Sequence, residues 1–436
     1  MPATEFLQDF INLKKYVRTK NNLRNNREKI LSIMQEKAPK NFVPTPFEYH
    51  QIVELEIDDL TNLGSGVGRI DGWVVMVPYA LGGERVKARI YRNHKNYSDA
   101  DLVEILRPSP DRVEPKCSLF GTCGGCQYQH LSYEAQLEWK RKQVADLMKR
   151  IGGIEFPVSP THPSPQQYGY RSKLTPHYER PRGSEMPVGF IMQGRRNMLV
   201  DVPQCPIASE AINKALPEAR ARIKKSNPRR GGTLLLRDCL EGVCQDNNAI
   251  QTERVGNITY QFCAGEFFQN NPFILPELIE YAIEEAQGTK YLVDAYCGVG
   301  VFALASAKKF ERVAGVEISS KAIVCANANA KINHIDNCEF LIGKAETIFA
   351  DVSKKFDGDN TSMIIDPPRA GCDTKFLEQL IEFAPKKLVY VSCGPDTQAR
   401  DLAYLTTHGY KLLKLQPFDL FPQTRHIENV ATLEKI

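Results

Sequence analysis

The stretch Leu292-Val293-Asp294-Ala295-Tyr296-Cys297-Gly298-Val299-Gly300-Val301-Phe302 decides the fold of the C-terminal half of the chain. It predicts a buried strand, a glycine turn and the start of a helix that continues through Ala303-Leu304-Ala305. From Phe267 to the last residue, helical and strand-like segments alternate in the same way. This alternation indicates a doubly wound, mainly parallel α/β sheet, whose ligands bind at the carboxyl ends of the strands.

The next predicted strand, Val313-Ala314-Gly315-Val316-Glu317, ends in an acid 23 positions after Asp294. An acidic side chain at that place suits the two hydroxyls of a ribose. The glycine turn lacks the full G-x-G-x-x-G pattern that favours pyrophosphate, so an NAD-dependent enzyme is only the alternative. The two strands resemble those of Rossmann-like methyltransferases, whose cofactor S-adenosylmethionine has a ribose and an adenine but no phosphate.

Two further strand ends carry reactive groups. Met363-Ile364-Ile365 leads into Asp366-Pro367-Pro368-Arg369, and an apolar run leads into Ser392-Cys393-Gly394-Pro395. A thiol at a strand's carboxyl end suggests a nucleophile, although a lone cysteine in an apolar run is more often a small core residue. Methyltransferases acting on exocyclic amines have an aromatic residue where Arg369 stands, and RNA cytosine-5 enzymes have a cysteine where Pro368 stands. The pattern therefore favours carbon methylation of uracil.

From about residue 50 onward the chain resembles the RNA uracil-5-methyltransferases, which make 5-methyluridine in ribosomal and transfer RNA. The resemblance rests on Phe267-Phe268-Gln269-Asn270-Asn271, on the motif around Cys393, and on Phe421-Pro422-Gln423-Thr424-Arg425-His426-Ile427-Glu428. Two positions depart from the family: Gly394 stands where asparagine is usual, and Val301 stands where several relatives carry asparagine. These departures affect fine positioning and remove no reacting group.

The resemblance implies a covalent mechanism and assigns a role to each residue. Cys393 would add to C6 of uracil so that C5 accepts the methyl group, and Glu428 would then remove the C5 proton. The target uridine must be unpaired or flipped out, because C6 of a paired base lies within the stack. The implied cofactor residues are Gln269, Tyr296, Glu317 and Asp366.

We expect an α/β protein with a Rossmann-like methyltransferase domain, an N-terminal OB-like β-barrel of the TRAM type, and an α+β central RNA-binding domain. The predicted parts are a basic helical arm and linker at residues 1–46, the barrel at 47–108, the central domain at 109–265 and the methyltransferase domain at 266–436. The basic residues of the arm predict either a solvated helix face or a phosphate-binding segment. They are Lys14, Lys15, Arg18, Lys20, Arg24, Arg27 and Lys29.

A cysteine loop in the central part carries Cys117, Cys123 and Cys126 with the spacing C-x5-C-x2-C, and Cys205 follows at a distance. Four thiolates suit an iron-sulfur cluster or a structural zinc ion, and this asymmetric spacing does not favour zinc. The family resemblance implies a [4Fe-4S] cluster on these four cysteines, with a structural role.

Composition limits the remaining possibilities. The sequence has 42% apolar and 25% charged residues, as soluble globular proteins do, and no apolar run long enough to span a bilayer. With Glu5 and Asp9 near its start, the chain has no apolar secretion signal, so we expect a cytoplasmic monomer. The expected substrate is large-subunit ribosomal RNA, with uridine 54 of tRNA as the alternative. A non-catalytic RNA-binding or RNA-remodelling protein is the alternative of another class.

Overall fold

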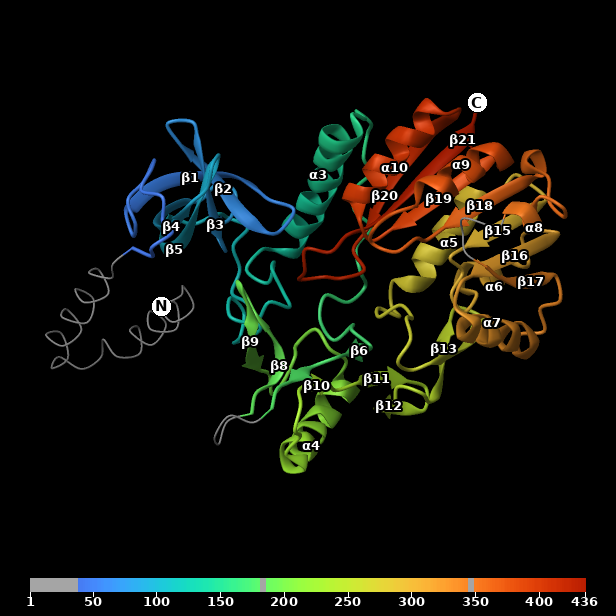
Figure 1. Cartoon of the computed structure of the whole chain (residues 1–436), viewed down its shortest axis with the longest axis horizontal. Helices are drawn as coiled ribbons and strands as arrows, with labels where there is room; N and C mark the ends of the chain where they lie inside the picture. The colour runs from blue at the N-terminus through green and yellow to red at the C-terminus, as the bar shows by residue number, and fades with distance from the viewer. Residues whose placement is uncertain (1–37, 181–185, 344–348) are drawn as a thin grey trace, which may run out of the picture. The chain divides into compact units, whose positions relative to one another are not determined.

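The computed structural model describes residues 38–180, 186–343 and 349–436 (Figure 1). The chain divides into two compact units: one extends to Ser132 and includes Met192–Arg196, and the other contains Tyr133–Ile191 and Asn197–Ile436. The basic residues of the predicted arm lie outside the described residues. The predicted division into four parts stays a prediction. No helix among the described residues has the length and apolarity needed to cross a bilayer.

The first unit contains a closed five-stranded barrel, drawn in blue in Figure 1, in the order β1-β2-β3-β5-β4. Its interior is filled by alternate residues of the strands, such as Val75 and Val77 of β3 and Val86 and Ala88 of β4. The expected OB-like barrel is therefore confirmed. The strands are β1 (Ile52–Leu60), β2 (Ser65–Ile70), β3 (Trp73–Pro78), β4 (Arg85–Asn93) and β5 (Tyr97–Arg107).

The second unit contains the expected Rossmann-like sheet, with strands in the order β17-β16-β15-β18-β19-β21-β20. The first five strands are parallel. The strand order reverses between β15 and β18: β16 and β17 follow on one side of β15, and β18 and β19 follow on the other. β21 is inserted antiparallel to both β19 and β20. The strands are β15 (Tyr291–Ala295), β16 (Arg312–Glu317), β17 (Cys338–Ile342), β18 (Thr361–Ile365), β19 (Lys387–Ser392), β20 (Tyr410–Phe418) and β21 (Glu428–Lys435).

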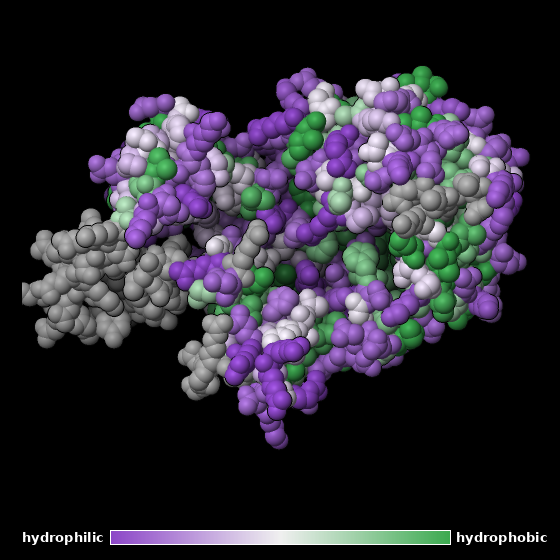
Figure 2. All heavy atoms as spheres, in the orientation of Figure 1, coloured by the Kyte–Doolittle hydropathy of each residue, from purple (hydrophilic) through white to green (hydrophobic). Residues whose placement is uncertain are grey.

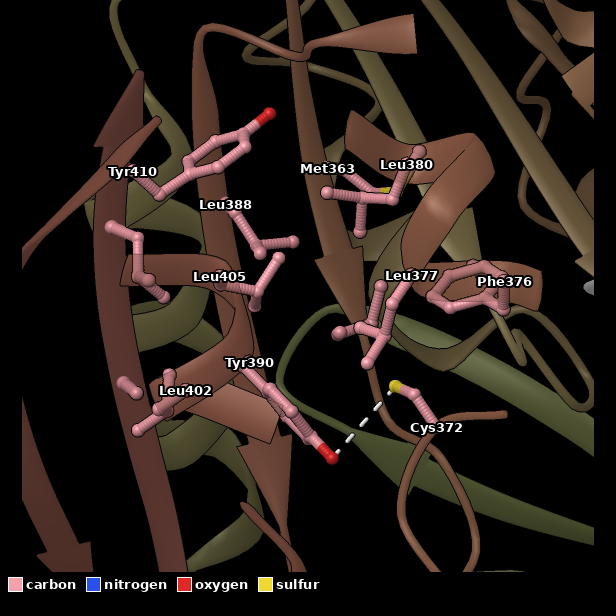
Figure 3. Packing of buried hydrophobic residues seen from close by; sticks show 14 of the residues in the cluster. Met363, Cys372, Phe376, Leu377, Leu380, Leu388, Tyr390, Leu402, Leu405 and Tyr410 are labelled. Atoms are coloured by element: carbon pink, nitrogen blue, oxygen red, sulfur yellow. Dashed lines mark hydrogen bonds between the residues drawn. The ribbon is translucent and has the colours of Figure 1, made fainter. Parts of the chain in front are cut away.

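Helices cover both faces of this sheet, so its strands are apolar on both sides. Along β19, Leu388 and Tyr390 face one core, whereas Val389 and Val391 face the other. Figure 3 shows the first core, where side chains of β18, β19 and β20 meet those of α9 and α10. The helices are α3 (Tyr133–Gly152), α5 (Leu275–Ala286), α6 (Val301–Ser306), α7 (Ser320–Ile332), α8 (Phe349–Val352), α9 (Thr374–Phe383) and α10 (Pro395–Thr407).

Short strands and one helix make up the α+β segment between α3 and the large sheet. The helix α4 (Glu210–Ser226) begins at Ser209, whose side chain accepts a hydrogen bond from the Ile212 amide. Hydrophilic side chains cover this helix in Figure 2. The strands are β6 (Lys173–Leu174), β7 (His177–Tyr178), β8 (Val188–Met192), β9 (Arg195–Asp201), β10 (Gly232–Thr233), β11 (Leu236–Cys239), β12 (Gly242–Cys244), β13 (Ile250–Val255) and β14 (Ile258–Cys263).

Buried polar contacts tie helix α3 to the segment between β20 and β21. The Lys140 ammonium lies 2.5 Å from the Asp419 carboxylate, and both side chains are fully buried. Burial lowers the pKa of Lys140, against the attraction of Asp419. Gln136 accepts a hydrogen bond from the Gln423 amide at 3.0 Å and donates one to the Gln423 side chain at 3.1 Å. These contacts fix the polypeptide that leads into β21.

We expect Lys140→Met to lower the free energy of unfolding by about 3 to 5 kcal/mol, because it leaves the Asp419 carboxylate buried without a counter-charge. Lys140→Met combined with Asp419→Leu should recover most of the loss. Urea unfolding followed by Trp139 fluorescence measures both effects, in a Trp73→Phe background that removes the other of the two tryptophans.

Lys142→Ala is the matched control, because Lys142 pairs with Asp146 on the exposed side of the same helix. This substitution should lower the free energy of unfolding by less than about 1 kcal/mol. A single variant of Lys140 as stable as the double variant would contradict the role given to the buried pair.

Candidate active site

The pairing of β19 with β21 brings Cys393 and Glu428 together. Ser392, the last residue of β19, faces Asn429 across the antiparallel pair. The next facing positions are therefore Cys393, directly after β19, and Glu428, the first residue of β21. Gln398 of α10 locks this end of the pair, since its amide donates to the Tyr390 and Asn429 carbonyls at 2.8 and 3.2 Å.

The surroundings of Cys393 keep its thiol protonated at neutral pH. Burial is the main reason that its pKa rises to about 11, and the charges of Glu428 and Asp366 raise it further. The Arg369 guanidinium acts in the opposite direction, through its charge and a hydrogen bond. Arg369 is thus the side chain at this site that favours the thiolate.

Glu428 is buried, at 2% exposure, and its Oε1 has no hydrogen-bond partner among the described residues. Burial first, and then the charge of Asp366, raise its pKa well above the ordinary value for a glutamate. Burial also raises the pKa of Asp366 to about 7. Two carboxyl groups in one poorly hydrated place resist carrying two charges, so the pair retains a proton near neutral pH. A carboxylate with a raised pKa is a stronger base.

Asp366 and Arg369 belong to the loop that follows β18. The Arg369 carbonyl accepts a hydrogen bond from the Thr397 hydroxyl at 3.1 Å, and its guanidinium lies 3.3 Å from His426 Nδ1. Burial and nearby cations, Arg369 first among them, lower the pKa of His426 to about 3. The imidazole is therefore neutral and can accept a hydrogen bond from Arg369. The sequence motifs contain both residues, but sequence reasoning gave neither of them a role.

The same loop is anchored to helix α10 beyond Arg369. The Asp401 carboxylate accepts hydrogen bonds from the Cys372 amide at 2.8 Å and from the Tyr390 hydroxyl at 2.7 Å. Arg400 donates to the Ala370 and Cys372 carbonyls at 3.1 and 3.2 Å. Figure 3 shows the Tyr390 hydroxyl directed toward the Cys372 sulfur. These contacts fix the far end of the loop that carries Asp366.

Gly394 lies where this loop and α10 approach each other most closely. A Cβ atom at position 394 would lie 2.9 Å from the Thr397 hydroxyl and 3.1 Å from the Arg369 carbonyl. Real Cβ atoms essentially never approach within 3.0 Å of another heavy atom. The missing side chain therefore allows the contact between Thr397 and Arg369.

The turns after β15 and β16 form the predicted cofactor site. Tyr296 and Gly298 have φ angles of +67° and +55°, so the chain reverses tightly after β15. Glu317 accepts hydrogen bonds from the Gly298 amide at 3.1 Å and the Ser319 amide at 2.9 Å, which fixes its carboxylate beside that turn. Asp294 accepts one from the Ala303 amide at 2.8 Å, and its other oxygen is buried without a partner.

Gln269 lies between two anchored neighbours. The Phe268 ring stacks on the Phe262 ring at 4.3 Å, and the buried Asn271 amide donates to the Leu420 carbonyl at 2.9 Å. Gln269 itself is half-buried and forms no hydrogen bond with a described residue, so its amide is open to a ligand. Leu420 belongs to the segment that leads to Glu428, which links the glutamine motif to the predicted base.

The predicted cysteine cluster finds no support. The described residues contain no group of three or more His, Cys, Asp or Glu side chains that could hold a metal ion. Cys117, Cys123 and Cys126 belong to the first unit and Cys205 to the second. The described residues therefore do not support the predicted [4Fe-4S] cluster, and no step of the chemistry depends on one. A pattern of sequence spacing does not guarantee that the sulfur atoms converge.

Comparisons with known proteins identify the family of the chain. The family model "tRNA (Uracil-5-)-methyltransferase" matches residues 243–436, and the TRAM domain model matches residues 47–103. The chain is 40% identical to a tRNA (uracil(54)-C(5))-methyltransferase of Schizosaccharomyces pombe, over 90% of this chain and 80% of the relative. It is 33% identical to the Saccharomyces cerevisiae protein of the same name, over 94% and 78% of the two chains.

A solved structure is similar over most of its length as well. It is a tRNA (uracil-54, C5)-methyltransferase of Pyrococcus abyssi in complex with S-adenosyl-L-homocysteine, with a TM-score of 0.67 and 26% identity. The similarity covers 87% of this chain and all of that chain. With relatives this similar along most of both sequences, the protein belongs to the RNA uracil-5-methyltransferase family and uses S-adenosylmethionine to methylate C5 of uracil in RNA.

Proposed function

We propose that this protein methylates uridine 54 of tRNA through a covalent bond between Cys393 and C6 of the uracil. The observation that carries the mechanism is the facing position of Cys393 and the buried Glu428 at the end of the β19–β21 pair. The two yeast relatives and the archaeal structure, all named for uracil 54 of tRNA, support the substrate. The expectation of large-subunit ribosomal RNA is therefore replaced by its alternative.

S-adenosylmethionine fits the turns after β15 and β16. The half-buried Glu317 carboxylate is held there by two backbone amides, which suits hydrogen bonds from a ribose. Tyr296, Gln269 and Asp366 are the other side chains that we assign to this ligand. When bound, the cofactor supplies an electrophilic methyl group on a positively charged sulfur.

The first step that the residues perform is the attack of Cys393 on C6. Burial raises the thiol pKa to about 11, so the thiol carries a proton that must pass to solvent, which the half-buried Cys393 can reach. Arg369 stabilises the anion that forms. As the sulfur bonds to C6, the electrons of the C5–C6 double bond move toward the C4 oxygen. C5 then carries enough electron density to take the methyl group.

Glu428 completes the reaction. After methyl transfer, C5 carries both its proton and the new methyl group, so the double bond cannot reform until the proton leaves. The raised pKa makes the Glu428 carboxylate a suitable acceptor once it is deprotonated. Its uptake of the proton returns electrons to the ring, the bond between C6 and sulfur breaks, and the Cys393 thiolate is released. A purely RNA-binding protein would have no use for this buried pair.

Incubation with methyl-labelled S-adenosylmethionine and total RNA tests the function. We expect the label in the tRNA fraction as 5-methyluridine at position 54, and none in a tRNA transcript that carries cytidine there. Label confined to large-subunit ribosomal RNA would overturn the substrate, and an unlabelled pool would overturn the enzyme activity.

Cys393→Ala should abolish turnover, since no nucleophile remains, and keep the affinity for the cofactor. Glu428→Gln should form the adduct and fail to resolve it, so a slowly migrating protein–RNA species should accumulate on a denaturing gel. Cys338→Ala and Glu434→Gln are matched controls, on β17 and at the far end of β21. Parental turnover in the Cys393 variant would exclude the covalent route.

Glu428→Gln should also lower the pKa of the Cys393 thiol, because it removes a negative charge that raises this pKa. Alkylation by iodoacetamide between pH 8 and 10, mapped to Cys393 by mass spectrometry, should become faster than in the parent. Glu434→Gln should leave the rate unchanged. An unchanged or slower alkylation of Cys393 in the glutamine variant would show that the Glu428 charge does not raise the thiol pKa.

A further inference from the structure

Two cations face each other outside the catalytic pair. Lys173 of β6 is the direct cross-strand partner of Arg237 of β11. Like charges directly opposite on antiparallel strands destabilise the pair unless another group compensates them. Arg171 adds a third positive charge, and its guanidinium donates a hydrogen bond to the Lys173 carbonyl at 2.9 Å.

No carboxylate compensates this group at close range. The Lys173 ammonium donates to the Gly265 and Glu266 carbonyls, each at 3.2 Å. The Arg237 guanidinium donates to the Glu266 carbonyl at 3.4 Å and lies over the Phe262 ring at 5.0 Å. Neither Lys173 nor Arg237 forms an ion pair with a described residue. The carboxylates of Glu266 and Glu253 act on them only from farther away.

Arg237 still has an unused donor. Its side chain is among the largest fully buried ones, at 1% exposure, and no described residue is a hydrogen-bond partner of its Nε. Burial, and then the charge of Arg237, lower the pKa of Lys173 to about 8, and burial lowers that of Arg237 to about 10. Buried donors of this kind are normally satisfied, so the group lacks an acceptor that carries negative charge.

The group adjoins the glutamine motif. Gly265 and Glu266, whose carbonyls Lys173 contacts, directly precede Phe267 and Gln269 in the chain. Phe262, which lies under Arg237, stacks on Phe268. The Ser172 amide donates to the Asn270 carbonyl at 2.8 Å, which joins β6 to the same motif. An anion at Lys173 and Arg237 would therefore lie next to the segment that carries Gln269.

We propose that the half-buried Lys173 and Arg171 bind one backbone phosphate of the substrate RNA, and that the buried Arg237 guanidinium adds positive charge behind them. This inference rests on the proposed function, which supplies an RNA substrate to this part of the molecule. A phosphate has the negative charge and the several acceptor oxygens that the three cations lack. Its negative charge would offset the repulsion between Lys173 and Arg237.

The experiment measures RNA binding against salt concentration, without methyl donor, for a synthetic stem–loop that contains the target uridine. Each lost phosphate contact should reduce the slope of log K against log salt by about 0.7 to 0.9. We expect this reduction for Lys173→Gln and for Arg171→Gln. Lys308→Gln, which removes an exposed lysine after α6, is the matched control and should keep the parental slope.

A second arm identifies the phosphate. Uncharged methylphosphonate groups are introduced one at a time along the stem–loop. One of them should weaken binding to the parent several-fold and have little further effect on Lys173→Gln, because both changes remove the same contact. Arg237→Gln is measured only if its unfolding transition matches that of the parent.

Two results would overturn the proposal: parental salt slopes in both the Lys173 and the Arg171 variants, or equal sensitivity of parent and Lys173→Gln to every methylphosphonate. Lys173 would then serve only to hold the Gly265–Glu266 carbonyls. In that case the parent still makes 5-methyluridine, so this failure is distinct from a failure of the proposed function, in which no RNA is methylated.

Discussion

The antiparallel insertion of β21 beside β19 is the constraint on which the site depends. In a parallel pair, the first residue of one strand lies at the opposite edge from the last residue of its neighbour. Because β21 runs the other way, its first residue, Glu428, comes to the edge where β19 ends at Ser392. The carboxyl ends of the parallel strands β15, β16 and β18 lie at the same edge. One strand direction thus brings the proposed nucleophile and base to the sheet edge where the predicted cofactor residues lie.

The constraint holds only if the chain enters β21 in register, since a slip of one residue would move every side chain to the other face. Buried polar contacts prevent such a slip. Four side chains hold the segment from Asp419 to Gln423. Lys140 pairs with the Asp419 carboxylate, and Gln136 accepts a hydrogen bond from the Gln423 amide. Tyr170 and Asn271 donate to the Pro422 and Leu420 carbonyls. Helix α3, the glutamine motif and the sheet therefore all help to fix the position of Glu428.

Much of the fold was predictable from the sequence, because strand periodicity and glycine turns are local signals. Apolar runs predict the strands that end at Ala295, Glu317 and Ile365. The ends of these runs also show which residues lie at the carboxyl edge of the sheet. The roles of Cys393 and Glu428 were implied only by resemblance, and their facing positions could not be read from the sequence, since a strand buried on both faces, such as β21, has the same pattern in either direction. Contacts between distant segments, such as Arg369 with His426 and Lys173 with Arg237, leave no local pattern. The [4Fe-4S] cluster implied by the family resemblance finds no support among the described residues.

The close approach at Gly394 has an evolutionary consequence. The nucleophile's neighbour and the loop after β18 share one small volume, in which the Thr397 hydroxyl and the Arg369 carbonyl already touch. A relative that carries a side chain at position 394, such as the asparagine usual in the family, must hold that loop or residue 397 differently. The residues at positions 369, 394 and 397 are thus expected to co-vary among homologues.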